Sequence, residues 1–413
     1  MIEFLVELEI LYDEGEHYTE LGSRPQDPAT HLELQQQHQH PTTTINLHNG
    51  RRRPQRPEGL QKSLDTTKVS YMRVGTSGLK LSVPILGAMS FGHKDWQPWV
   101  VDDQAEVEKL LLAAWDRGLN TWDTANVYSN GVSEKMIGEV VKKNKLDRKK
   151  LVILTKCYGT VGEDPATSHI KYPELKGTKD YVNQGGLSRA AIFNAVEASL
   201  ERLQMDYIDL LQIHRYDYET PAEETMKALH DLVQSGKVRY IGERLLNVAF
   251  QLAELQTVAK TNSWTQFISM QNHYSLCYRE EEREMNKYCH KTGVGLIPWA
   301  PLYRGHLARP LGSDSTSRND ASKAAGTKMD ADSLTEEDKI IIGRVEELAK
   351  KKGWKMSQVA LAWTVQKGAN PIVGFSGVGR LDEAVAVKGK VLTEDEIKYL
   401  EEPYKAKSIV GHS

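Results

Sequence analysis

The stretch GLNTWDTANVYSNGVSEKMIGE, residues 118–139, places a carboxylate and a phenol directly after an apparent strand. The apolar run from Leu119 to Trp122 has the length of a short buried strand, and Asp123 ends it. Ser133, followed by a glutamate and two apolar residues, has the pattern of a capped helix start. Tyr128 is therefore expected in a loop that joins a strand to a helix.

A tyrosine in such a loop donates a proton readily at neutral pH only if a neighbouring cation stabilises the phenolate. The next apolar run, LVILTK, ends in Lys156, and the run YIDLLQI is followed by His214. Three successive runs thus finish on an ionisable side chain. In parallel α/β folds the carboxyl ends of the strands form the face that carries the site.

These side chains together predict a general acid for a substrate carbonyl. Asp123 could keep Lys156 charged, and Lys156 could then stabilise the phenolate of Tyr128. His214 could form a hydrogen bond with the substrate oxygen. Taken singly, each residue has an ordinary explanation, such as a helix cap, a surface aromatic or a packed histidine. A lysine at a strand end could also form an imine in an aldolase, but a paired carboxylate argues against this because it keeps the amine protonated.

Asp123, Tyr128, Lys156 and His214, in this order, resemble the catalytic tetrad of the aldo-keto reductases. The resemblance extends from Tyr71 to the C-terminus, and the most similar branch is the fungal aryl-alcohol dehydrogenase-like one. Six blocks carry it: DTANVYSNGVSE, LVILTK, YIDLLQIHR, GKVRYIG, SMQNHYS and GVGLIPWAPL. The resemblance implies an NADP-dependent oxidoreductase that reversibly reduces an aldehyde or ketone to an alcohol. NADPH is the expected cofactor, and NADH is less favoured.

The resemblance also implies which residues contact the nicotinamide. Gln271 and Asn272 are expected to face it, with Gln271 the better candidate for its carboxamide. Trp299 is expected to stack on the nicotinamide ring, and the alternative for this residue is a core aromatic. No side chain delivers hydride, so a carrier of this kind is required.

A second group of contacts is expected in the loop after the last strand, the usual barrel position for a phosphate. Ser376 and Arg380 match positions beside the 2′-phosphate of NADP, and Glu383 matches the adenine contact. Gly377 and Ala384 stand where related proteins often have polar residues. The preference for NADPH over NADH therefore depends mainly on Arg380.

One loop departs from the family pattern. Related proteins have glycine, a small residue and then serine or asparagine after the fifth strand, whereas this chain reads Gly242, Glu243, Arg244 and later Asn247. The expected amide-binding side chain is missing unless Asn247 replaces it, and the two charged residues are expected to crowd the cofactor. An error at a splice junction would produce such an anomaly, and transcript reads across the junction would test it.

Eight apolar runs alternate with helical segments such as 102–117, 188–203 and 221–233, which predicts an α/β fold, a (β/α)8 TIM barrel. A doubly wound sheet is the alternative, but LGAMSFG after the first run lacks its glycine pattern. A β-hairpin from Tyr71 is expected to plug the barrel. Long insertions after the third and seventh strands are expected to line the mouth. The runs are 85–89, 119–122, 151–155, 207–213, 238–241, 267–270, 294–299 and 371–375.

Composition sets the remaining limits. Residues 1–67 have few large apolar side chains and are predicted to be a disordered extension, with residues 68–413 forming the barrel domain. The net charge of −3 gives no argument for a nucleic-acid or membrane partner. No metal is expected, because the histidines show no ligand spacing. Three cysteines and an acidic amino terminus without a leader pattern favour the cytoplasm.

Two other functions remain open at this point. The family includes channel-associated members, so a cofactor-binding regulatory subunit with little turnover is one alternative. An imine-forming aldolase is the other. The sequence does not identify the physiological carbonyl substrate or the oligomeric state.

Overall fold

The computed structural model describes residues 56–167, 171–244, 248–313 and 334–409. The chain divides into two compact units, Met1–Arg56 and Pro57–Ser413, and nearly all described residues belong to the second. The predicted disorder of residues 1–55 lies outside the described residues. The same prediction is wrong for residues 58–66, because helix α1 (Glu58–Thr66) occupies them. This helix buries no residue, so no core-facing period marks it.

The core of the second unit is a barrel of eight parallel strands, and all eight were predicted. Their order in the sheet is β10-β3-β4-β5-β6-β7-β8-β9. The sheet closes because the amides of Asn370 and Ile372 donate to the carbonyl oxygens of Leu296 and Pro298, each at 2.9 Å. The strands are β3 (Ile85–Gly87), β4 (Thr121–Asp123), β5 (Val152–Cys157), β6 (Ile208–Ile213), β7 (Val238–Arg244), β8 (Phe267–Gln271), β9 (Gly295–Leu296) and β10 (Ile372–Gly374).

The predicted hairpin, β1 (Ser70–Arg73) with β2 (Lys80–Val83), closes the amino-terminal end of the barrel. Its residues Val74 and Leu81 join a buried cluster with inward-facing strand residues such as Leu154 and Leu210. The amide of Thr76 donates to the carbonyl of Gly293, just before β9, at 2.9 Å. The opposite, carboxyl-terminal end is therefore the end left for a site.

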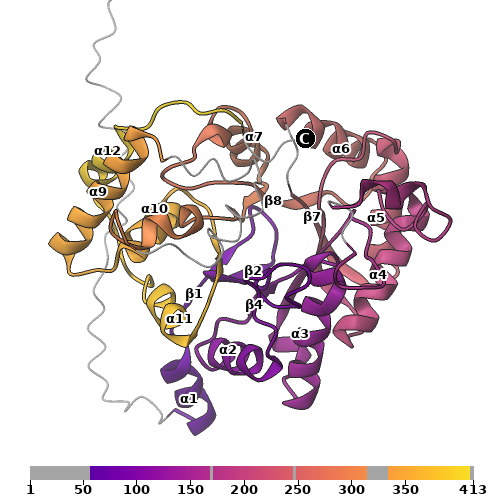
Figure 1. Ribbon diagram of the computed structural model, residues 1–413, viewed down its shortest axis with the longest axis horizontal. Coiled ribbons are helices and arrows are strands. Elements are labelled where there is room, and N and C mark those ends of the chain that lie inside the picture. The colour runs from indigo at the N-terminus through magenta and orange to yellow at the C-terminus, as the bar shows by residue number, and fades with distance from the viewer. Residues whose placement is uncertain (1–55, 168–170, 245–247, 314–333, 410–413) are drawn as a thin grey trace, which may run out of the picture. The chain divides into compact units, whose positions relative to one another are not determined.

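Helices surround the strands (Figure 1). Successive helices α3, α4, α5 and α6 pack against one another around the barrel. The segment 102–117, predicted to be helical, contains α2, whose apolar face with Val107 and Leu111 at its centre is buried. The helices after α1 are α2 (Gln104–Asp116), α3 (Val132–Lys143), α4 (Arg189–Leu203), α5 (Ala222–Gln234), α6 (Ala249–Thr261), α7 (Met285–Thr292), α9 (Glu336–Lys352), α10 (Met356–Gln366), α11 (Val378–Val385) and α12 (Glu394–Glu401).

A serine caps one of these helices, but the cap predicted at Ser133 does not form. Ser188 caps α4, since its Oγ accepts a hydrogen bond from the amide of Ala191 at 3.2 Å. Ser133 does not cap α3, which has Gly131 at its N-cap. Instead the Ser133 hydroxyl donates to the carbonyl of Ala88 at 2.9 Å. This bond joins α3 to the residue that follows β3.

Both predicted insertions leave the carboxyl end of a strand. The first follows β5 and contains a short 3-10 helix, η4 (Pro173–Gly177). The second follows β9, and its described beginning contains the 3-10 helix η6 (Tyr303–Ala308). Residues 314–333 of this second insertion lie outside the described residues.

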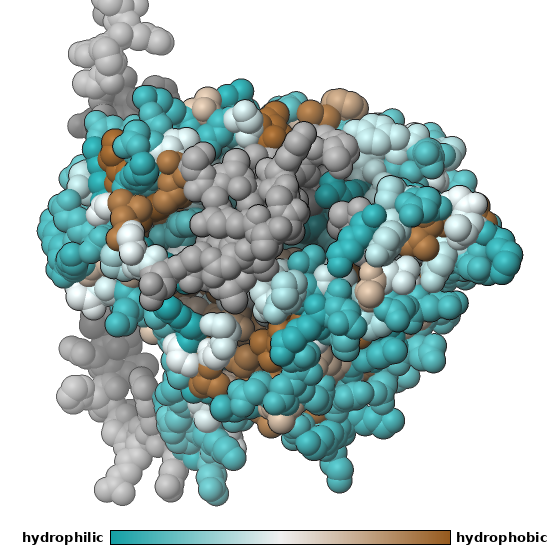
Figure 2. All heavy atoms as spheres, viewed as in Figure 1, coloured by the Kyte–Doolittle hydropathy of each residue, from teal (hydrophilic) through white to brown (hydrophobic). Residues whose placement is uncertain are grey.

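The described surface on the face shown in Figure 2 is mostly hydrophilic, and its hydrophobic side chains lie in small separate areas. None of the helices in the described ranges is long and apolar enough to cross a membrane. The same residues contain no group of three or more histidine, cysteine, aspartate or glutamate side chains arranged to hold a metal ion.

Candidate active site

A buried ion pair joins the carboxyl ends of neighbouring strands β4 and β5. The ammonium of Lys156 donates to Asp123 Oδ2 at 2.7 Å and to the carbonyl oxygen of Thr124 at 2.6 Å. The Lys156 side chain is fully buried, and that of Asp123 is 3% exposed. Charges so far from water need full hydrogen bonding. The second oxygen of Asp123 has it, since Gln212 and Gln271 donate to Oδ1 at 3.1 and 3.0 Å.

Tyr128 begins the 3-10 helix η2 (Tyr128–Gly131), directly beside this pair. Its hydroxyl lies 3.4 Å from the Lys156 ammonium, which donates to it, and the ammonium lies 5.0 Å from the centre of the phenol ring. The turn after Tyr128 is tight, because Ser129 and Asn130 have φ values of 51° and 49°. The Ser129 hydroxyl accepts from the amide of His93 at 3.1 Å, which helps to hold this conformation.

His214 completes the cluster from the end of β6. Its ring centre lies 6.1 Å from that of Tyr128, with the two rings nearly perpendicular at 82°. Its backbone amide donates to the carbonyl of Cys157 at 2.9 Å, which fixes the strand end. Asp123, Tyr128, Lys156 and His214 therefore converge at the carboxyl-terminal end of the barrel.

Gln212 belongs to this cluster and was not predicted. Its amide donates to Asp123 and its carbonyl accepts from Gln271 at 2.9 Å. Gln212 lies two residues before His214 on β6, so the two side chains share the inward face. The alternation of the strand could have identified it.

The residues expected near the nicotinamide lie at the ends of β8 and β9. Gln271 is bonded to Asp123 and Gln212, and Asn272 donates to Asn286 of α7 at 2.7 Å. Within the described part of the chain, Asn272 Oδ1 and Trp299 Nε1 are buried without a hydrogen-bond partner. One is an acceptor and the other a donor, so they are complementary to a ligand with a carboxamide group.

Trp299 is part of an aromatic stack that the sequence did not indicate. The His273 ring stacks on Trp299 at 4.2 Å between ring centres and on Tyr278 at 4.1 Å. The stack joins the loop after β8 to the end of β9. It holds the indole in a fixed orientation at the barrel mouth.

The expected phosphate-binding residues lie in the loop after β10 and in α11. Ser376 and Arg380 are exposed, as solvent-facing anion ligands would be. Glu383 accepts hydrogen bonds from Ser357 and from Arg380, the latter at 3.2 Å. Ala384 is buried in the core, so its side chain is not available to a ligand.

The unusual residues after the fifth barrel strand face in different directions. Glu243 is fully buried and is paired in the sheet with Ile213, a residue of the main core cluster, so it lies on the helix side of β7 and not on the inward face. Burial raises the pKa of the Cys289 thiol on α7, and the charge of Glu243 raises it further. Arg244 does lie at the mouth, over Trp299, with 5.6 Å between the guanidinium carbon and the ring centre. Asn247 lies outside the described residues.

The cysteines have structural environments. Cys157, Cys277 and Cys289 are all free and buried. Burial raises the pKa of the Cys157 thiol to about 12, so it stays protonated at neutral pH. Cys157 is therefore a core residue and not a nucleophile.

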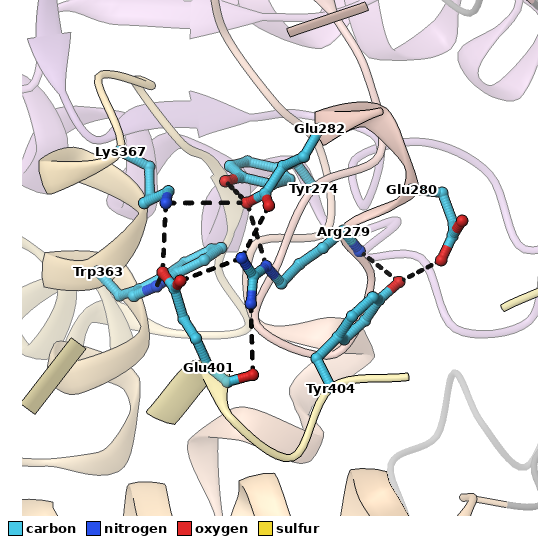
Figure 3. A network of polar contacts seen from close by, with 8 residues as sticks. All are labelled: Tyr274, Arg279, Glu280, Glu282, Trp363, Lys367, Glu401 and Tyr404. Carbon is cyan, nitrogen blue, oxygen red and sulfur yellow. Dashed lines mark hydrogen bonds and ion pairs between the residues drawn. The ribbon is translucent and has the colours of Figure 1, made fainter. Parts of the chain in front are cut away.

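The loop after β8 is fastened by a polar network that we call the C-terminal clamp (Figure 3). Arg279 donates to Glu282 at 2.7 Å and to Glu401 of α12 at 3.0 Å. The Tyr404 hydroxyl accepts from the amide of Arg279 at 2.8 Å and donates to Glu280 at 2.6 Å. Because this loop begins with Asn272 and His273, the clamp links the C-terminal segment to the site. Its members are Tyr274, Arg279, Glu280, Glu282, Trp363, Lys367, Glu401 and Tyr404.

Replacing Glu282 with glutamine is expected to lower the free energy of unfolding at pH 7 by about 1–3 kcal/mol, because partly buried Arg279 loses a charged partner. Burial raises the pKa of Glu282, but hydrogen bonds from Arg279 and Tyr274 outweigh it and hold this pKa below its usual 4.5. A depressed pKa means that the contribution is complete above pH 4.5 and is lost as pH falls toward the lowered value.

Urea unfolding between pH 4 and 8 would measure this difference between the wild type and Glu282→Gln. The difference should be constant at neutral pH and should shrink at the acidic end. Glu347→Gln is the matched control, since exposed Glu347 also accepts from a tyrosine, Tyr399, at 2.7 Å. A loss as large in the control would contradict the assignment of a special role to the clamp.

The fold and these contacts define a parallel α/β-barrel protein with a buried, charged site at the carboxyl ends of its strands. Residues 85–405 match the Aldo/keto reductase family. Since the match covers most of the chain, the chain belongs to this family and is an oxidoreductase.

Relatives from fungi agree with this assignment. Aldo-keto reductase dtxS3 of Metarhizium robertsii is 51% identical over 362 residues, covering 86% of this chain and 97% of its own. Versiconal hemiacetal acetate reductase of Aspergillus parasiticus is 48% identical over 342 residues, covering 83% and 98%. "Putative aryl-alcohol dehydrogenase AAD16" of Saccharomyces cerevisiae is 46% identical over 341 residues, covering 82% and 97%. The resemblance inferred from the motifs, including its aryl-alcohol dehydrogenase-like branch, is confirmed.

Proposed function

We propose that this protein is an NADPH-dependent reductase that converts an aldehyde or ketone into an alcohol and also catalyses the reverse reaction. The observation that carries the proposal is the contact between the Tyr128 hydroxyl and the Lys156 ammonium, which is in turn held by Asp123. This arrangement supplies a proton donor whose conjugate base is stabilised by a fixed positive charge. The name of one relative, a putative aryl-alcohol dehydrogenase, supports aromatic carbonyl compounds as the substrate class.

NADPH, when bound, supplies the hydride that adds to the carbonyl carbon. Tyr128 gives its hydroxyl proton to the carbonyl oxygen, on which negative charge develops. Lys156 stabilises the phenolate that remains, and Asp123 balances the ammonium in a buried site. His214 positions the carbonyl oxygen by a hydrogen bond. In the reverse direction the phenolate of Tyr128 accepts the proton of the alcohol.

The proposed cofactor contacts form two groups, one for the nicotinamide and one for the adenosine phosphate. Gln271 and Asn272 would hold the carboxamide of the nicotinamide, and Trp299 would pack against its ring. Ser376 and Arg380 would bind the 2′-phosphate, and the exposed positive charge of Arg380 favours NADPH over NADH. Glu383 would contact the adenine. We place the enzyme in the cytoplasm, since its three cysteines are free and buried.

The imine-forming alternative is disfavoured by the hydrogen bonds of Lys156. An amine that attacks a carbonyl must lose its proton, whereas this ammonium donates to a carboxylate and to a backbone carbonyl.

Oxidation of NADPH in the presence of a panel of aromatic aldehydes tests the proposal. Aldehyde-dependent loss of NADPH absorbance is the expected result. Tight NADPH binding without turnover would instead support a cofactor-binding regulatory subunit. Borohydride trapping of a carbonyl compound on Lys156, without a need for nicotinamide, would support an aldolase.

A further inference from the structure

Arg244 occupies a position in the barrel mouth that the proposed mechanism does not use. It ends β7, and its Cα is paired in the sheet with that of Gln271 on β8. On the other side, Gln212 pairs with Gly242 and Ile213 with Glu243, so the next position in this register is His214. Arg244 therefore lies between the strand ends that carry His214 and Gln271.

The side chain of Arg244 faces the inside of the barrel. Side chains alternate along a strand, so Arg244 shares a face with Tyr240 and Gly242. Tyr240 packs against the inner cluster of the barrel, and a Cβ on Gly242 would contact inward-facing Gln212 and Leu210. The guanidinium then reaches the ring of Trp299.

The charge of Arg244 is not matched by any acid in the described part of the chain. Its Nε is buried and has no hydrogen-bond partner there. The carboxylate of the candidate site, Asp123, already accepts from Lys156, Gln212 and Gln271. Arginine carries five donors in a planar fork that suits a carboxylate or a phosphate. A partly buried fork without an acid is therefore prepared for an anion from outside the protein.

A second guanidinium, that of Arg215, lies close to Arg244. Arg215 follows His214, and burial lowers its pKa, with the positive charge of Arg244 lowering it further. The two cations are thus close enough to repel one another. An anion that approached Arg244 would relieve this repulsion.

We propose that Arg244 is a recognition residue for an anionic oxygen group of a ligand in the barrel mouth. The inference rests on the proposed reductase function and deepens it by naming the ligand chemistry. Two sources offer that chemistry, a carboxylate on the aldehyde substrate and the diphosphate of the nicotinamide cofactor. In both, two oxygens of the anion accept hydrogen bonds from the guanidinium fork.

The test compares para-carboxybenzaldehyde with para-nitrobenzaldehyde, which has a neutral group of the same shape. In Arg244→Gln, the ratio of the KM for the carboxylated aldehyde to the KM for the nitro aldehyde should rise by about 10- to 100-fold, the range for a hydrogen bond to a charged group. Arg244→Lys keeps the charge but loses the planar pair of donors, so its KM ratio should lie between those of the wild type and Arg244→Gln. Arg239→Gln is the matched control, an exposed arginine at the other end of β7 that lies over Tyr207.

The outcomes separate the two sources. A changed ratio with an unchanged Kd for NADPH identifies the substrate carboxylate as the anion. An unchanged ratio with a Kd for NADPH raised by about tenfold or more identifies the cofactor diphosphate. If neither quantity changes, or if Arg239→Gln has the same effect, the inference is overturned.

The inference can fail independently of the proposed function. If the wild type reduces neither aldehyde, it is the proposed reductase function that fails for these substrates. Calorimetric titration of wild type and Arg244→Gln with para-carboxybenzaldehyde and with NADPH then still decides the role of Arg244, because binding needs no turnover.

Discussion

Tyr128→Phe is expected to lower kcat for aldehyde reduction by about 10²- to 10⁴-fold, the range that a positioned general acid contributes. The phenol oxygen is the only atom removed, so the ring should keep its packing against Trp96 and His214. The Lys156 ammonium loses one contact but keeps Asp123 and the Thr124 carbonyl. Steady-state kinetics with a saturating aldehyde would measure the effect.

Two further measurements separate a chemical role from a structural one. The Kd for NADPH, followed by fluorescence, should remain within about threefold of the wild-type value, well under the tenfold that 1.4 kcal/mol would cause. Tyr399→Phe removes a hydroxyl that donates to Glu347 on the surface, and it should turn over normally. Normal turnover in Tyr128→Phe would refute the assigned proton donor.

The site residues at the strand ends could be predicted, because the fold alone brings these strand ends together. Asp123, Lys156 and His214 each end or follow an apolar run, and successive parallel strands bring their carboxyl ends to one edge. Residues at neighbouring strand ends are close enough for their side chains to meet. The ammonium of Lys156 and the carboxylate of Asp123 are accordingly 2.7 Å apart. Local sequence was sufficient for this part.

Contacts that depend on packing between distant segments could not be predicted. Ser133 has the local pattern of a cap, yet its hydroxyl serves Ala88, which is 45 residues away. Glu243 and Arg244 are adjacent and charged, but both faces of a barrel strand are covered, so composition does not tell which one points inward. In the structure, the side chain of Arg244 lies at the barrel mouth and that of Glu243 faces the helix layer.

Lys156→Met is expected to cause the largest loss of stability, about 3–5 kcal/mol, because it leaves the carboxylate of Asp123 buried without its cation. The remaining donors, Gln212 and Gln271, are neutral amides and compensate only partly. Urea unfolding at pH 7 would measure the loss. Lys143→Met is the matched control, since Lys143 pairs with Glu108 at 2.7 Å but is 69% exposed, and water should compensate for its removal.

The double variant Asp123→Asn with Lys156→Met distinguishes a buried charge from a lost contact. Removing both charges should restore about 2 kcal/mol or more of the stability lost in Lys156→Met, since no unpaired ion remains in the core. Aldehyde turnover should stay low in both variants, because neither retains the ammonium beside Tyr128. If the losses in free energy of unfolding caused by the two single substitutions simply add in the double variant, the two charges are not coupled. The proposal that this ion pair stabilises the phenolate of Tyr128 would then lose its physical basis.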